Sequence, residues 1–204
     1  MRKKLDMDRV DYLPCFLSEI PALLRSGTRP IDVAMLNVSP PDTHGLCTFG
    51  VSVDVVPAAV EAADVIIAQV NPQMPRVHGD GFIHIDQIDA WWEHDAPIPE
   101  FHPPTLGDIE RAIGQHAAAI IEDGSTLQMG IGAVPDAVLA ALHGHKHLGI
   151  HTEMMSDGAL DLIEAGAVDN SQKTRHPGKT VSGFVMGTKR LYDFLDDNPR
   201  SIQL

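Results

Sequence analysis

The sequence has little positive charge. Lysine and arginine total 15 residues against 28 aspartates and glutamates, and the formal net charge is −13 at pH 7. No basic run is long enough to follow a phosphate backbone, so we expect no nucleic-acid partner. An acidic surface also repels polyanionic small molecules at long range. A site for such a molecule must therefore use backbone amides, helix N-termini and a few cations.

Cysteines and long apolar runs are also scarce. The two cysteines, Cys15 and Cys47, are each flanked by apolar residues and match neither a disulfide framework nor a paired metal-binding spacing, so we interpret both as reduced core thiols. No apolar stretch of signal-peptide length follows the basic N-terminus, and none approaches the ~20 residues of a membrane span. These absences predict a cytoplasmic protein.

Strand and helix patterns alternate along the 204 residues. Three apolar runs predict buried parallel strands, namely Ile31 to Val38, Val65 to Val70, and Leu148 to His151 leading into Thr152 and Glu153. Helices are predicted over Pro57 to Ala63, Asp108 to Glu122, and Ala159 to Ala165. This alternation predicts an α/β fold with open, largely parallel sheets.

The helix over Asp108 to Glu122 has the clearest pattern. Ile109, Ile113, Ala117 and Ile120 fall on one face, as in a helix that packs on a core. Thr105 and Asp108 resemble a capping box, and Gly124 suits the C-terminal end.

A proline-rich stretch from Trp91 to Pro104 separates two groups of elements. It carries four prolines and few charges, which is poor material for helix or sheet. We place a domain boundary there, with one unit over residues 1–96, a linker over 97–107 and a second unit over 108–204.

A glycine-rich turn lies in the second unit. Ser125 to Met129 reads as a strand, Gly130 to Val134 as a turn and Pro135 to Leu142 as a helix that starts on proline. The two glycines, Gly130 and Gly132, permit close backbone approach, and the helix N-terminus offers free amides to an anion. The pattern lacks the third glycine of a dinucleotide fingerprint and the lysine of a P-loop, so a plain tight turn remains the alternative.

Glu153 is the candidate nucleophile. It stands where the strand from Leu148 is predicted to end, beside the crevice in which open α/β sheets bind ligands. Periodicity alone favours the plainer alternative, in which Glu153 caps the next helix or pairs with a cation.

Several other polar residues are candidates of a weaker kind. Gln69 and Asn71, at the end of the predicted strand over Val65 to Val70, have the chemistry to orient a substrate carboxylate, and a turn before Pro72 is the alternative. Arg76, His78 and Asp80 follow in a loop that either faces the cleft between the two units or is solvated surface.

The 11 histidines do not predict a metal site. His143, His145 and His147 lie near a helix end, where cationic side chains are favourable, and no pattern of two histidines and one carboxylate is evident. We predict no metal.

Long segments of the chain resemble family I CoA-transferases of the acetyl-CoA hydrolase and 4-hydroxybutyrate CoA-transferase kind. GIGAVPDAVL, LGIHTEMMSDGALDLIEAGAV and KTRHPGKTVSGFVMGTKRLYDFLDDNP are similar to the start of that family's catalytic domain. DYLPCFLSEIP, NVSPPDTHGLCTFGVSVD and IIAQVNPQMPRVHGD are similar to the later part of its N-terminal domain. The resemblance covers nearly the whole chain.

This resemblance implies two sheet units of the NagB/RpiA-like kind and a transferase that uses coenzyme A as a substrate. Glu153 would be the nucleophile of a ping-pong exchange through a glutamyl-CoA thioester. Partial burial beside Met154 and Met155 would strip its hydration. Met129, Gly130, Ile131, Gly132 and Ala133 would line the CoA, with the amides of Ile131 and Gly132 forming half of an oxyanion hole.

Members of the family are about twice as long as this chain. We therefore expect both units to be incomplete, with exposed sheet edges and apolar faces that favour a homo-oligomer or a complementing fragment. Three alternatives stay open: net acyl-CoA hydrolysis at the same thioester, a noncatalytic CoA-binding or interaction module, and a Rossmann-like nucleotide-binding domain.

Overall fold

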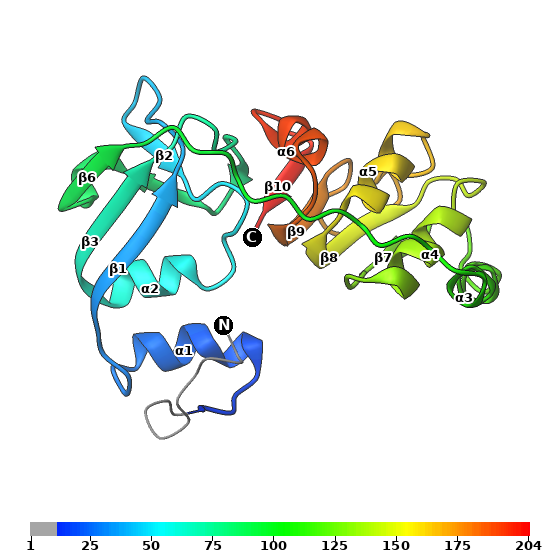
Figure 1. Ribbon diagram of the computed structural model, residues 1–204, viewed down its shortest axis with the longest axis horizontal. Helices are drawn as coiled ribbons and strands as arrows, with labels where there is room; N and C mark the ends of the chain where they lie inside the picture. Colours follow the sequence, from blue (N-terminus) through cyan, green and yellow to red (C-terminus); the bar gives the residue numbers. More distant parts are fainter. Residues whose placement is uncertain (1–11) are drawn as a thin grey trace.

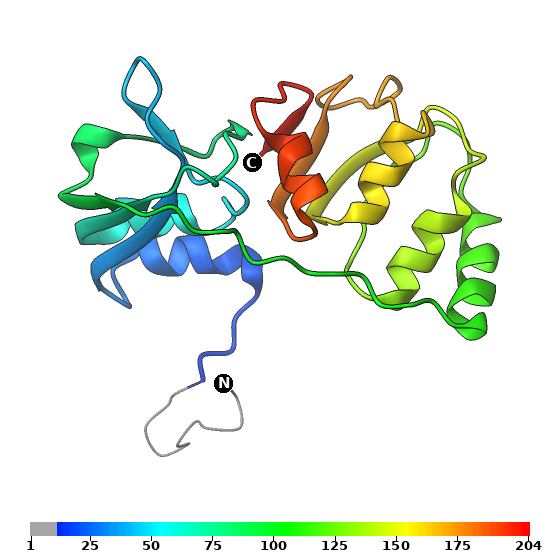
Figure 2. The same ribbon diagram turned by 45° about the horizontal axis from the view of Figure 1, so that its top comes forward.

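The structure is a computed structural model that describes residues 12–204. Two groups of elements follow each other along the chain (Figures 1 and 2). The first group contains η3 (Leu17–Glu19), α1 (Ile20–Arg25), β1 (Ile31–Val38), β2 (Leu46–Thr48), α2 (Val56–Ala62), β3 (Ala63–Val70), β4 (His78–Gly79), β5 (Phe82–His84), η4 (Ile85–Gln87) and β6 (Ala90–Glu93). The second group contains α3 (Asp108–Ala118), β7 (Thr126–Leu127), α4 (Ala133–Ala141), β8 (Gly149–Met155), α5 (Asp157–Glu164), β9 (Thr180–Val185), α6 (Lys189–Leu195) and β10 (Ser201–Gln203).

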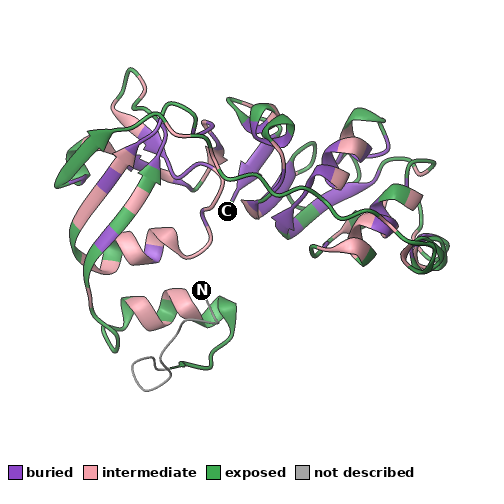
Figure 3. Ribbon diagram, viewed as in Figure 1, coloured by how far each residue is buried: buried purple, intermediate pink, exposed green. Residues whose placement is uncertain are grey.

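The first sheet is parallel and has the order β1-β3-β6. One face packs against α2, and its buried side chains include Val38, Ala68 and Val70. On the other face Val33 and Met35 are 44% and 78% exposed, and Val65 is exposed as well. Parts of the strands of this sheet are accordingly green in Figure 3. The prediction of fully buried strands was therefore wrong here, because among residues 12–204 only one side of the sheet has a covering layer.

The second sheet is also parallel and has the order β4-β10-β9-β8-β7. Helices α4, α5 and α6 connect its consecutive strands, as parallel pairing requires. Its core is larger than that of the first sheet. The side chains of Leu142, Leu148, Ile150, Met155, Leu160, Leu162, Leu191 and Leu195 have no solvent exposure. This core fixes the position of β8, the strand that carries Glu153.

The two groups are joined by more than the linker. Strand β4 lies early in the chain, yet it pairs with β10 at the edge of the second sheet. Ser52 also forms an isolated bridge with Phe184 of β9. Trp91 and Trp92 belong to strand β6, so the irregular segment starts after Glu93 and runs beside both sheets to α3 (Figure 2). The division at residues 97–107 stays a prediction.

Helix α3 is shorter than predicted and packs on a different face. Gly114 and Ala118 are its buried residues, and a Cβ at Gly114 would lie 2.4 Å from the carbonyl oxygen of Ala137 in α4. Ile109 and Ile120 are 74% and 83% exposed. Close approach of two helices requires small residues at the contact, so the isoleucine face points outward. The first turn is capped by Glu110, whose carboxylate accepts from the Gly107 amide, and not by Thr105.

The structure also tests the predictions about the two cysteines, membrane spans and metal sites. Cys47 is a buried free thiol as predicted, whereas Cys15 is exposed, so its interpretation as a core residue was wrong. Across residues 12–204 no helix is long and apolar enough to cross a membrane. Within the same residues no group of three histidine, cysteine, aspartate or glutamate side chains is placed to hold a metal ion.

Candidate active site

The glycine-rich turn lies between β7 and α4, but its boundaries differ from the predicted ones. Strand β7 contains only Thr126 and Leu127, and α4 begins at Ala133, so Pro135 is the third residue of the helix. Gly132 caps the helix with φ 112° and ψ 178°, a conformation that is essentially restricted to glycine. The turn from Gln128 to Gly132 is therefore set by backbone geometry that another residue type would strain.

A buried hydroxyl fixes the turn to strand β8. The amide of Met129 donates to Thr152 Oγ1 over 3.0 Å. The same oxygen lies 3.0 Å from the carbonyl oxygens of Met129 and Met154, either of which accepts its proton. Thr152 is only 4% exposed, which makes these bonds strong relative to bonds in water. Thr152 therefore holds the turn beside the residue that follows it, Glu153.

The turn also offers unused backbone donors. In the part of the chain that the structure describes, the amides of Gly130 and Ile131 donate to no protein oxygen. Both residues are exposed. Free amides on a rigid turn suit a developing negative charge, because they need no rearrangement when the charge forms.

Glu153 lies within strand β8 and not at its end. The strand continues to Met155, and Glu153 is exposed on the face opposite to buried Thr152 and Met154. The expected partial burial of Glu153 was wrong, because the side chains that approach this face leave Glu153 itself exposed. The pairing of Thr152 with Ser182 and of Met154 with Phe184 places Gly183 of β9 beside Glu153. A Cβ at Gly183 would lie 3.0 Å from the carbonyl oxygen of Glu153, so glycine keeps this place open.

Two hollows meet at Glu153. One, of about 420 Å³, is lined by Glu153, Met154, Phe184 and the turn residues Gln128 to Ile131. The other, of about 410 Å³, lies toward the beginning of β8 and is lined by His151, Glu153, Gly183 and residues from the first part of the chain, among them Pro21 and Asp54. The structure therefore brings Glu153 together with Met129, Gly130 and Ile131. Gly132 and Ala133, the other two residues expected at CoA, line neither hollow.

A basic segment adjoins the second hollow. The rings of His151 and His176 make an edge-on contact with centroids 6.1 Å apart. Lys173 is 6% exposed, and its Nζ donates to the carbonyl oxygens of Ile150 (2.6 Å) and Lys179 (2.5 Å). Burial lowers the pKa of Lys173 to about 8. Desolvation, together with the charges of Lys173, His176 and Arg175, lowers the pKa of His151. His151 is thus a neutral hydrogen-bonding group near neutral pH.

The weaker candidates from the first part of the chain lie elsewhere. The Asn71 amide group donates to Ala96 O and accepts from the amides of Gln73 and Ala96, which is the turn-forming alternative. Gln69 lies within β3, and neither Gln69 nor Asn71 lines the hollows beside Glu153. Their role as substrate-orienting residues stays a prediction.

The MPRVHGD segment has structural contacts. Arg76 forms an ion pair with Asp42 at 2.7 Å and lies over the ring of Phe82. His78 pairs with Asp197 at 3.0 Å, across the junction between β4 and the last part of the chain. Asp80 N donates to Gln203 O beside the same pair of strands. These contacts join the two groups of elements.

The histidines near the end of α4 also have separate partners. His145 Nε2 lies 3.0 Å from the carbonyl oxygen of Ile121, and His147 Nδ1 lies 2.7 Å from Asp169. His143 is exposed. Each histidine has its own surroundings, so the spacing of His143, His145 and His147 does not create a common site.

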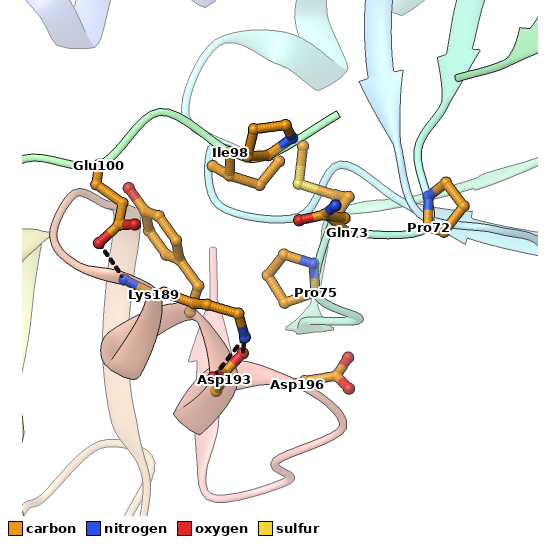
Figure 4. A pocket seen from close by; sticks show the side chains of 11 residues that line it. Pro72, Gln73, Pro75, Ile98, Glu100, Lys189, Asp193 and Asp196 are labelled. Atoms are coloured by element: carbon orange, nitrogen blue, oxygen red, sulfur yellow. Dashed lines mark hydrogen bonds and ion pairs between the residues drawn. The ribbon is translucent and has the colours of Figure 1, made fainter. Parts of the chain in front are cut away.

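A separate cavity of about 320 Å³ lies where the loop after β3, the linker and α6 meet (Figure 4). Prolines 72, 75 and 97 form much of its wall. Lys189 on α6 binds Asp193 through its side chain, and its backbone amide donates to Glu100 of the linker over 2.9 Å. The Tyr192 hydroxyl donates to Pro99 O over 2.9 Å. This cavity contains none of the predicted site residues and lies on a seam that holds the linker against the second sheet.

Residues 1–102 match the acetyl-CoA hydrolase/transferase N-terminal domain. The chain belongs to the acetyl-CoA hydrolase/transferase family, as its sequence motifs predicted.

Similar proteins cover nearly all of this chain. It is 52% identical over 198 residues to the 4-hydroxybutyrate coenzyme A transferase of Clostridium kluyveri, a match that covers 97% of this chain and 46% of that protein. It is 49% identical to the succinyl-CoA:acetate/propanoyl-CoA:succinate CoA transferase of Fasciola hepatica, covering 97% and 42%. The crystal structure of 4-hydroxybutyrate CoA-transferase from Porphyromonas gingivalis superposes with a TM-score of 0.91 at 46% identity, covering 97% and 51%. This chain thus spans about half the length of the relatives it matches.

Sequence reasoning missed several residues around Glu153. His151 is on the same face of β8 as Glu153, and strand alternation alone would have found it. Gly183 carried no signal, because its place depends on the register between β8 and β9. Pro21 and Asp54 line the hollow although they lie far from Glu153 in the sequence, and no local sequence pattern predicts such a contact.

Proposed function

We propose that this chain carries the nucleophile and part of the oxyanion site of an acyl-CoA:carboxylate CoA-transferase. The observation that carries the proposal is the hollow that Glu153 shares with Gly130 and Ile131, whose amides have no acceptor among residues 12–204. A carboxylate next to free, rigid donors has what acyl transfer needs, namely a nucleophile and a place for the oxyanion.

The exchange proceeds through two acyl anhydrides and one thioester. A Glu153 oxygen attacks the thioester carbonyl of an acyl-CoA, the oxyanion takes hydrogen bonds from Gly130 and Ile131, and the CoA thiolate leaves. The thiolate then attacks the carbonyl carbon of Glu153, which releases the first carboxylate and forms glutamyl-CoA. An incoming carboxylate reverses both steps, so that a new acyl-CoA departs and the Glu153 carboxylate is restored.

The relatives suggest the class of acyl group. Their names include 4-hydroxybutyrate, succinyl, propanoyl and butyryl donors and acetate as an acceptor. We infer that this chain handles short acyl groups of the same kind, with coenzyme A as a substrate and no metal. CoA reaches Glu153 over the turn, along Met129 to Ile131.

Net hydrolysis is a second candidate function, favoured by one observation. Glu153 is exposed, so water has access to any thioester formed there. Hydrolysis needs only water in place of the second carboxylate. A covering partner would exclude water and favour transfer.

We also propose that the working site is an assembly. Parallel sheets are normally covered on both faces, yet Val33, Met35 and Val65 leave one face of the first sheet apolar and exposed. Ile109, Ile113 and Ile120 form a second exposed apolar surface on and just after α3. A second copy or a complementing polypeptide would cover these surfaces.

A transfer assay with a charge-removing variant tests this function. CoA exchange between labelled acetate and butyryl-CoA is measured on the chain alone and after adding a polypeptide that corresponds to the part of the Clostridium protein not covered here. Glu153→Gln keeps the shape but removes the anion, so we expect a loss of more than about 10³-fold. Glu122→Gln, on an exposed turn, is the matched control and should keep full activity. A Glu153→Gln protein with near-normal exchange, and with its glutamine verified intact, would rule the proposal out.

A further inference from the structure

Asp54 is a second carboxylate at the hollow of the nucleophile. It lines the hollow of about 410 Å³ together with Glu153, and no lysine or arginine of the described chain lines that hollow. Asp54 is half-buried and forms no ion pair within residues 12–204. His151 also lines the hollow, but desolvation lowers its pKa, so it adds no charge near neutral pH. The charged groups on the walls are therefore all negative.

The backbone fixes Asp54 beside the strand that neighbours Glu153. The amides of Val53 and Asp54 both donate to the carbonyl oxygen of Gly183, over 3.1 and 3.3 Å. Gly183 lies next to Glu153 in the register of β8 and β9. Asp54 has φ 22°, a value that is uncommon and strained for residues other than glycine. Because such strain concentrates at functional sites, the outlier favours a role for Asp54 beyond packing.

A purely structural role is the alternative for this carboxylate. It accepts hydrogen bonds from Ser52 Oγ over 3.0 Å and from the backbone amide of Val55, the residue that precedes α2. An asparagine side chain also accepts hydrogen bonds in such turns and tolerates positive φ. The turn therefore needs an acceptor at position 54 but does not need its negative charge.

The two hollows divide a bound acyl-CoA at Glu153. The turn amides of Gly130 and Ile131 belong to the other hollow, where the proposed function places the CoA and the oxyanion. The acyl substituent of the same carbonyl carbon then points away from the turn. Its path leads over Gly183, which has no side chain to block it, and into the hollow that Asp54 lines.

The walls of this hollow suit a hydrocarbon chain. Its apolar residues come from separate parts of the chain, namely Leu17, Pro21, Val55, Val181 and Leu204. An alkyl chain gains free energy by leaving water for such a surface. A carboxylate at the far end of the chain would lose water without finding a cation, and it would be repelled by Asp54.

We propose that this hollow is the acyl pocket and that Asp54 is its specificity-determining residue, which admits short uncharged acyl groups and excludes those with a terminal carboxylate. A butyryl group belongs to the admitted class and a succinyl group to the excluded one. The direction of the acyl group rests on the proposed function. The exclusion of a second negative charge depends only on the hollow itself.

An NMR titration with unreactive amides tests the pocket on the chain as it exists. Butyramide and succinamate share a four-carbon chain and differ in the terminal carboxylate, and neither acylates Glu153. The Hε1 resonance of His151, which lines the hollow, is followed and is assigned with His151→Gln. We expect butyramide to shift this resonance and to bind at least about fivefold more tightly than succinamate.

Two variants separate the charge of Asp54 from its place in the turn. Asp54→Asn removes the charge and keeps the shape, so the affinity for succinamate should rise to that for butyramide. Ser52→Ala removes a hydrogen bond from the same carboxylate but keeps the charge, so the preference for butyramide should remain. Asp64→Asn changes an exposed carboxylate outside the hollow and should also leave the preference unchanged.

Each other result overturns the inference. If butyramide does not shift the His151 resonance, the hollow is not an acyl pocket. If the wild type binds the two amides equally, Asp54 does not select against charge. If Ser52→Ala loses the preference as fully as Asp54→Asn does, the carboxylate serves the turn alone.

The choice of acyl donor separates the acyl pocket from the proposed function. In the assembled enzyme, glutamyl-CoA should form at least about tenfold faster from butyryl-CoA than from succinyl-CoA, and Asp54→Asn should remove most of this difference. If both donors react equally in the wild type and in Asp54→Asn, the specificity role is refuted and the transferase stands. If butyramide binds as expected but no acyl-CoA ever labels Glu153, the proposed function fails and the charge-selective hollow stands.

Discussion

The two sheets of this chain share a parallel arrangement but differ in what covers them. The first sheet has one packed face and one open face, on which Met35 is 78% exposed. The core of the second sheet has eight large apolar side chains with no exposure at all. The candidate nucleophile lies on the second sheet, where a complete core holds β8 and the turn after β7. A well-packed core beneath β8 therefore positions the carboxylate of Glu153 although Glu153 itself is exposed.

The largest expected effect comes from comparing one apolar residue in each sheet region. Leu162→Ala should lower the free energy of unfolding by about 2–5 kcal/mol, because it leaves a cavity in a fully buried site. Met35→Ala should change it by less than about 0.5 kcal/mol, since Met35 is on the open face. Urea unfolding measures both. A similar loss for Met35→Ala would show that the open face is covered in solution.

The next effect concerns the backbone of the turn. Gly132 has φ 112°, and a Cβ added there would meet no atom within 4 Å, so Gly132→Ala acts through strain alone and should cost about 1–3 kcal/mol. It should also weaken CoA binding, because the strain is relieved by moving Gly130 and Ile131. Gly144→Ala, which also meets no neighbour and has no positive φ, is the control. Equal stability of the two variants would contradict the proposed role of the Gly132 backbone.

The lowered pKa of Lys173, which bonds strand β8 of the second sheet, should make the free energy of unfolding depend on pH in the alkaline range. Its folded pKa of about 8 is below the ordinary lysine value of about 10.4, so the unfolded chain binds more protons between these two pH values. Stability should therefore rise with pH through that window and lose this dependence below about pH 8. Thermal unfolding between about pH 7.5 and 10.5 measures it. Lys173→Met should flatten the rise, whatever its effect on stability at pH 7; an unchanged slope would assign the rise to another group.

The smallest effect is expected at Asp169 on the surface. Hydrogen bonds from the Ser171 amide and hydroxyl and from His147 lower the pKa of Asp169 to about 2. This stabilisation is present above the unfolded value of about 3.9 and is lost as the pH falls toward 2. Because the side chain is 41% exposed, solvent screening keeps the contribution small. Stability is measured as the pH is lowered for the wild type, Asp169→Asn and the control Asp64→Asn. Only Asp169→Asn should lose less stability toward acid pH than the wild type.

Local patterns predicted the elements better than their surroundings. The run from Ile31 to Val38 is strand β1 to the residue, because alternation and β-branched side chains are local properties. The packing face of α3 was predicted wrongly from Ile109 and Ile120, because the close contact of Gly114 with α4 determines which face packs. Periodicity identifies an amphipathic face but not which neighbour can approach it.

The candidate site was predicted only in part, because its residues are found from local motifs but their neighbours depend on the tertiary fold. Glu153 and the turn at Gly130 were found from the family motif, and their common hollow depends on the parallel pairing of β7 with β8. The expected burial of Glu153 beside Met154 failed, because neighbouring residues of a strand point to opposite faces and Met154 therefore cannot cover Glu153. The approach of Asp54 to the hollow required the tertiary fold.

The most direct test of the central claim is to trap the covalent intermediate. The protein, alone and with the complementing polypeptide, is incubated with an acyl-CoA, treated with borohydride and digested for peptide mass spectrometry. We predict reduction of a single side chain, Glu153, in the peptide that contains HTEMM, with none in Glu153→Gln and normal labelling in Glu122→Gln. Labelling of a different carboxylate, or transfer activity in the assembled protein without labelling of Glu153, would contradict the covalent mechanism.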